Sequence, residues 1–209
     1  RYVQRVGDLK NPDMIILPGT KNTMEDLLWM RQNGMEAAIL KAAASGTIIF
    51  GVCGGYQMLG ETLADPLGVE AGGTIKGMSL LPMDTVFAGQ KTRTRVTGAF
   101  EAVGGILKEL SGVELEGYEI HMGDSGPEGL FSVRENVLGT YLHGFFDAPE
   151  LRDRLVSLLL ARKGLTWTGE AGPEDGQAYR EEQYDKLAAA LRASLDMEAV
   201  YRILEQGLD

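Results

Sequence analysis

The sequence is poor in cysteine, in histidine and in long apolar runs. Its one cysteine, Cys53, excludes an internal disulfide and a multi-cysteine metal site, and it suits a reducing cytoplasm. The two histidines, His121 and His143, leave few candidates for base chemistry. The most hydrophobic stretches, 14–17 and 47–52, have the length of buried strands and are too short to cross a bilayer. No signal-peptide pattern opens the chain, so we expect a cytoplasmic protein.

An excess of basic charge and the phosphate-binding loops of nucleotide enzymes are also missing. The chain has 30 Asp and Glu residues against 20 Lys and Arg, a net charge of −10, which argues against binding nucleic acid through its phosphates. Neither G-x-x-x-x-G-K-[ST] nor a strand-following G-x-G-x-x-G occurs, and Gly89 to Thr92 has a residue between its glycine and its lysine. We therefore expect neither a cofactor nor a metal in this chain.

The first third alternates buried strands with helices. Residues 13–17 read as a strand closed by Pro18-Gly19, and 47–52 read as a second strand. Apolar residues at helical spacing predict the helices that lie between and after these strands, over 21–32, 35–44 and 56–63. This order predicts an α/β fold of the flavodoxin-like type, with a mostly parallel central sheet flanked by helices.

The remainder mixes short strands with terminal helices. The expected elements are strands over 83–87, 92–100, 118–121 and 138–142, then helices over 149–160 and 182–204 with a loop at 172–176. No linker divides the chain, so residues 1–209 are expected to form a single domain. Because the first residue is Arg1 and not methionine, we expect a longer native chain to have been cut at this point.

The strongest chemical signal is the turn Gly51-Val52-Cys53-Gly54-Gly55-Tyr56-Gln57, between a buried strand and a helix. Such a turn forces its central residue into a strained backbone shape, and the glycines make room for it. The helix after Cys53 turns its N–H groups toward the sulfur, which favours the thiolate and supplies donors for an oxyanion. A lone cysteine is usually an inert core residue, but a core position does not need this glycine pattern. We therefore interpret Cys53 as a nucleophile.

A nucleophilic thiol needs a base, and both histidines lie at strand ends. Parallel sheets gather active residues at the carboxyl ends of their strands, where Cys53 is also expected. His143 ends the run Gly139 to Leu142 and is followed by glycine, while His121 shares one strand face with Glu119. These patterns leave the two histidines nearly equal as candidates.

Several segments resemble one family. The cysteine turn is similar to the G-x-C-x-G-x-Q signature of class I, triad-type glutamine amidotransferases. Further segments, spread over nearly the whole chain, resemble the cobyric acid synthase branch of this class. They are 13–23, 57–60, 65–70, 117–123, 139–144 and 184–188.

This resemblance implies a glutaminase domain with Cys53 as nucleophile and His143 as base. The backbone of Gly19, Thr20 and Gly54 would hold the oxyanion, and Gln57 would help to hold glutamine. It also implies an N-terminal synthetase domain of the same chain as partner, which would need ATP and magnesium. That domain would bind the corrinoid substrate, adenosylcobyrinic acid a,c-diamide, and amidate it at four peripheral carboxylates.

The sequence departs from the wider class at one position. Triad members carry His-x-Glu, whereas Phe145 stands in the third position here, as it does in the cobyric acid synthase branch. The working unit is therefore expected to be a Cys–His dyad, held by a backbone carbonyl or by another carboxylate, for which Glu119 is the candidate. Two alternatives stay open, namely the glutaminase subunit of another amide synthetase such as the lipid II isoglutaminyl enzyme, and a non-catalytic docking domain.

Overall fold

The computed structural model describes residues 1–100, 104–125, 130–167 and 176–207. The chain forms two compact units, residues 1–168 and 169–209, which are considered separately here. The expectation that residues 1–209 form a single domain stays a prediction. No helix among the described residues combines the length and the apolar character that a bilayer span requires.

The elements follow one another in an α/β order. The helices are α1 (Val6–Leu9), α2 (Thr23–Gln32), α3 (Met35–Ala44), α4 (Gly54–Met58), α5 (Pro149–Ala161), α6 (Gly176–Ser194) and α7 (Met197–Gln206), with 3₁₀ turns η1 (Gly105–Leu110) and η2 (Phe145–Asp147). The strands are β1 (Met14–Leu17), β2 (Ile48–Val52), β3 (Thr62–Asp65), β4 (Gly73–Lys76), β5 (Asp84–Ala99), β6 (Glu114–Asp124), β7 (Phe131–Arg134), β8 (Val137–Thr140) and β9 (Leu142–His143).

The first sheet has the strand order β1-β2-β8-β7, with β1, β2 and β8 parallel and β7 antiparallel to β8. Strand β2 is apolar throughout because both of its faces are covered. Ile49 belongs to one core, with side chains of α2 and α3, while Ile48 and Phe50 belong to a second core that includes α5. The expected mostly parallel sheet flanked by helices is confirmed.

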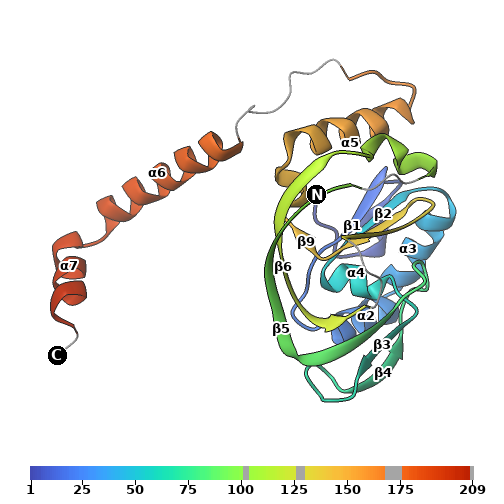
Figure 1. Ribbon diagram of the computed structural model, residues 1–209, viewed down its shortest axis with the longest axis horizontal. Coiled ribbons are helices and arrows are strands. Elements are labelled where there is room, and N and C mark those ends of the chain that lie inside the picture. The colour runs from blue at the N-terminus through green and yellow to red at the C-terminus, as the bar shows by residue number, and fades with distance from the viewer. Residues whose placement is uncertain (101–103, 126–129, 168–175, 208–209) are drawn as a thin grey trace. The chain divides into compact units, whose positions relative to one another are not determined.

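The second sheet has the order β4-β3-β5-β6-β9 and is mainly antiparallel. Strands β5 and β6 form a long curved ribbon along one side of the first unit (Figure 1). Strand β3 pairs with the first residues of β5, and β4 pairs with β3. The short strand β9 pairs with the middle of β6, where Tyr118 lies opposite His143. This pairing brings the end of β9 toward the carboxyl ends of β2 and β8.

Several elements differ from the expectations. The helix expected over 56–63 ends at Met58, and Thr62–Asp65 instead forms β3, which pairs with β4 and β5. The helix expected over 182–204 is two helices, because the carboxylate of Asp196 caps a new helix by accepting from the N–H of Ala199. Most of the loop expected at 172–176 lies outside the described residues.

Candidate active site

Cys53 occupies the sharp turn between β2 and α4. Its backbone has φ 53° and ψ −115°, a conformation that costs a non-glycine residue energy and is typical of functional positions. The turn is closely packed, since a Cβ on Gly51 would lie 2.7 Å from the carbonyl oxygen of Gly55. A Cβ on Gly55 would lie 2.1 Å from the carbonyl oxygen of Leu17. The glycines flanking Cys53 are therefore required by the close approach of α4 to β1 and β2.

The strain at Cys53 leads to a stability prediction. Cys53→Gly and Cys53→Ala both remove the thiol, but only glycine adopts a positive φ without steric cost. We expect Cys53→Gly to be the more stable variant by about 1 kcal/mol in the free energy of unfolding. Urea denaturation of the two variants measures this difference, and equal midpoints with equal slopes would show that the turn stores no strain at this residue.

The Cys53 side chain is partly exposed and lies beside His143 and β6. Its sulfur is 3.5 Å from the carbonyl oxygen of Ile120. A methyl group placed on Gly19 would lie 3.9 Å from the sulfur and 3.8 Å from Cε1 of His143. The thiol and the imidazole therefore border the same small space, above the Pro18-Gly19 turn that ends β1.

His143 is held between Tyr118 and the backbone of β6. Its ring stacks on Tyr118 with centroids 5.1 Å apart and planes 5° apart. Burial lowers its pKa, a hydrogen bond to the Ile120 backbone opposes this shift, and the neighbouring His121 adds to it. Its Nε2 is buried and has no hydrogen-bond partner in the described structure. A buried nitrogen that is neutral and unpaired is suited to accept a proton.

The second histidine is engaged elsewhere. His121 Nδ1 lies 2.9 Å from the carbonyl oxygen of Gly123, and its ring stacks on Tyr141 at a centroid distance of 3.7 Å. The carboxylate of Glu119 is 4.0 Å from Nε2 of His121, so this pair shares a face as the strand alternation predicts. The His143 ring instead interacts with the Ile120 backbone and with the Tyr118 ring. An orienting role for Glu119 stays a prediction.

The residues expected to hold an oxyanion lie together. A Cβ on Gly54 would be 3.1 Å from the backbone nitrogen of Thr20 and 2.5 Å from its Cγ2. In the part of the chain that the structure describes, neither Thr20 N–H nor Gly54 N–H has a hydrogen-bond acceptor. The Thr20 hydroxyl donates to the carboxylate of Asp26. Two backbone donors thus remain available next to the thiol and Gly19.

Gln57 lies on α4 and is 2% exposed. Its Nε2 donates to the carbonyl of Met122 at 3.0 Å and to the hydroxyl of Tyr141 at 3.2 Å, and its Oε1 accepts from Thr23 at 3.1 Å. Burial raises the pKa of Tyr141 to about 12, so its hydroxyl stays protonated. The Gln57 amide thus ties α4 to α2, β6 and the segment after β8. Contact of this amide with substrate stays a prediction.

The sequence interpretation missed Tyr118, Tyr141 and the carbonyl of Ile120. Tyr118 lies in a segment that the sequence predicts as a strand, but its stacking on His143 follows from the pairing of β6 with β9, which local patterns do not reveal. The carbonyl carried no signal, because any residue type supplies one.

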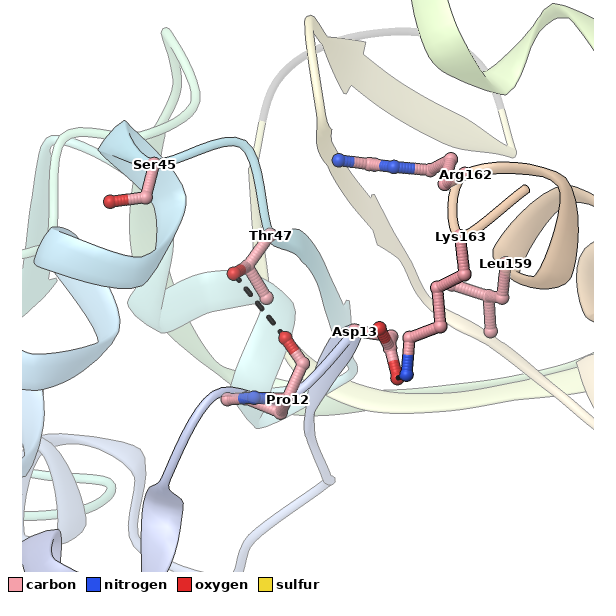
Figure 2. A pocket seen from close by; sticks show the side chains of 7 residues that line it. All are labelled: Pro12, Asp13, Ser45, Thr47, Leu159, Arg162 and Lys163. Atoms are coloured by element: carbon pink, nitrogen blue, oxygen red, sulfur yellow. Dashed lines mark hydrogen bonds and ion pairs between the residues drawn. The ribbon is translucent and has the colours of Figure 1, made fainter. Parts of the chain in front are cut away.

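A hollow of about 160 Å³ lies at the end of the first sheet opposite to Cys53 (Figure 2). It is lined at the amino ends of β1 and β2, where Thr47 donates to the carbonyl of Pro12 at 3.4 Å. Lys163 pairs with Asp13 at 2.8 Å, and Arg162 donates to the carbonyl of Gly46 at 2.6 Å. These contacts attach the chain just after α5 to the sheet. This hollow is therefore at the opposite end of β2 from Cys53 and takes no part in the candidate active site.

A mixed sheet flanked by helices, with a cysteine at the strand-to-helix turn, defines an α/β fold of the class I glutamine amidotransferase type. The family described as the CobB/CobQ-like glutamine amidotransferase domain matches residues 1–151, and the chain belongs to this family. A solved structure titled "Crystal structure of glutamine amidotransferase" is 18% identical, with a TM-score of 0.48 over 78% of this chain and 85% of its own.

The curated relatives with high identity include cobyric acid synthases. Those of Lachnoclostridium phytofermentans and Ruminiclostridium cellulolyticum are each 48% identical over 100% of this chain, which covers 45% and 44% of their own lengths. The cobyric acid synthase of Dehalococcoides mccartyi is 38% identical over 100% of this chain and 44% of its own length. The chain therefore spans less than half the length of these relatives.

Proposed function

We propose that the chain hydrolyses glutamine through a covalent cysteine intermediate and supplies the ammonia to a synthetase. The observation that carries this proposal is the convergence at the Gly19 turn. The strained Cys53 thiol and the ring of His143, whose Nε2 has no partner among the described residues, border one space at this turn. The unused N–H groups of Thr20 and Gly54 belong to residues that meet beside it. These are the nucleophile, base and oxyanion donors that acyl transfer requires.

The reaction begins when His143 takes the thiol proton and the sulfur of Cys53 attacks the glutamine carboxamide carbon. Thr20 and Gly54 stabilise the resulting oxyanion through their N–H groups. The tetrahedral intermediate collapses as His143 returns its proton to the leaving nitrogen, which gives ammonia and a γ-glutamyl thioester. Water, deprotonated by His143, then attacks the thioester, and glutamate leaves as the thiol is reprotonated. The Ile120 carbonyl orients the imidazole in place of a third side chain.

The ammonia serves amidation in the remainder of a longer chain. Because the relatives are cobyric acid synthases more than twice as long, we place the ATP- and magnesium-dependent step in an N-terminal synthetase domain. We further propose adenosylcobyrinic acid a,c-diamide as the acceptor of the amide nitrogen in that domain. A cysteine nucleophile must stay reduced to react, so we place the reaction in the cytoplasm.

Reconstitution tests this function. The chain, joined to an N-terminal synthetase part from one of the cobyric acid synthases, should amidate cobyrinic acid diamide with either glutamine or ammonia as nitrogen donor. The N-terminal part alone should accept only ammonia. A parallel pairing with the synthetase of the lipid II isoglutaminyl enzyme should give no glutamine-dependent product. A gain of glutamine dependence in that second pairing alone would overturn the assignment to corrinoid synthesis.

A further inference from the structure

A cavity of about 430 Å³ borders the proposed active site on the β5–β6 ribbon. Its lining is Arg93, Thr94, Arg95, Tyr118 and Ile120. Two of these residues touch the candidate catalytic groups directly, because Tyr118 stacks on His143 and the Ile120 carbonyl lies 3.5 Å from the Cys53 sulfur. The cavity is therefore separated from the thiol and the imidazole only by Tyr118 and Ile120, which line it and contact those groups.

Strand register sets the two arginines in line with these residues. Arg95 pairs with Tyr118 across β5 and β6, and Tyr118 pairs with His143 across β6 and β9. Directly paired residues in antiparallel strands project from the same face, about 5 Å apart. Arg95, Tyr118 and His143 thus form one row on one face of the sheet.

The second arginine belongs to the neighbouring row. Arg93 pairs with Ile120, the residue whose carbonyl contacts the thiol. Arg93 and Arg95 are two positions apart on β5, so their side chains share the face that bears the cavity.

The positive charge that lines this cavity is unusual for the chain. The net charge is −10, yet two exposed arginines lie side by side here. Within the described residues, neither guanidinium has a hydrogen bond or an ion pair. Two like charges at neighbouring positions repel one another, and an anion placed between them would relieve that repulsion.

We propose that Arg95, assisted by Arg93, binds the α-carboxylate of the substrate glutamine. This inference rests on the proposed glutaminase function. In extended glutamine the carboxamide carbon and the α-carboxylate carbon are about 5 Å apart, which is about the spacing of two paired strands. A substrate whose amide meets the thiol beside β6 is therefore long enough to extend its carboxylate toward the Arg95 side chain on β5. A planar guanidinium donates two parallel hydrogen bonds to a carboxylate, which selects free amino-acid glutamine over amides that lack this group.

Two alkylating reagents separate carboxylate binding from thiol reactivity. 6-Diazo-5-oxo-L-norleucine carries the amino-acid head of glutamine and alkylates the thiol with loss of N₂, whereas iodoacetamide has no carboxylate. We expect Arg95→Ala to lower the second-order rate of Cys53 labelling by the diazo compound by roughly 10- to 100-fold, the range typical of a lost charged hydrogen bond. Its labelling by iodoacetamide should be unchanged, and Arg95→Lys should recover part of the loss.

Arg134→Ala is the matched control, since it removes an exposed arginine from β7 and should match the wild type with both reagents. The proposal is overturned if Arg95→Ala and Arg93→Ala react with the diazo compound at the wild-type rate, or if iodoacetamide labelling falls equally. A wild-type protein that is not labelled at Cys53 by the diazo compound contradicts the glutaminase function itself, and carboxylate binding falls with it.

Discussion

Cys53→Ala is expected to lower the glutamine-dependent rate by at least about 10⁴-fold, because removal of a nucleophile abolishes the covalent route and leaves only binding and oxyanion stabilisation. The substitution keeps the Cβ atom and the positive φ of the turn, so the packing of α4 on β1 and β2 is preserved. Release of glutamate from glutamine is the direct measurement. Labelling by 6-diazo-5-oxo-L-norleucine, followed by mass spectrometry, should show the adduct in the wild type and none in the variant.

The ammonia-dependent reaction provides the internal control for Cys53→Ala. In a chain that contains the synthetase part, amidation with ammonia bypasses the thiol and should proceed at the wild-type rate. Equal labelling of the variant and the wild type, or a variant that still uses glutamine, would remove the basis of the proposed mechanism and favour a docking module.

The main sheet and the cysteine turn could be predicted because each rests on a local pattern. Strands β1 and β2 are short, continuously apolar segments, and the glycines around Cys53 report the crowding of a strand-to-helix turn. Strand β3 was missed because Thr62–Asp65 continues the apolar spacing of α4, and its conformation is set by pairing with β4 and β5. Nearest-neighbour patterns do not encode that pairing.

The choice between the two histidines shows the limit of sequence patterns at the site. His121 and His143 both lie in strands of the second sheet, and strand alternation gives each a plausible face. What separates them is tertiary: β9 crosses to pair with β6 at Tyr118, and this pairing brings His143 to the space beside Gly19. His121 is occupied by Gly123 and by Tyr141. The Ile120 carbonyl contacts both the thiol and His143, and it could not be predicted because every residue type has a backbone carbonyl.

His143→Ala is expected to reduce glutamine hydrolysis by at least about 10³-fold, since general-base catalysis typically contributes 10²- to 10⁴-fold and also activates the thiol here. His121→Ala should retain measurable activity, because its ring interacts with Gly123 and Tyr141 and not with the thiol. Steady-state kinetics of the two variants decide between the bases. Loss of activity in His121→Ala with retention in His143→Ala would assign the base to the other strand.

The pH dependence distinguishes a base from a merely structural histidine. His143 works as the neutral imidazole, so kcat/KM falls as the pH drops through its pKa. Burial, together with His121, holds that pKa below the ordinary value of 6.5, and the acidic limb of the profile should therefore lie below pH 6.5. Removing His121 takes away one of the influences that lower this pKa, so the acidic limb of His121→Ala should move to higher pH. A limb that stays in place in this variant would show that His121 does not act on the group that titrates in the profile.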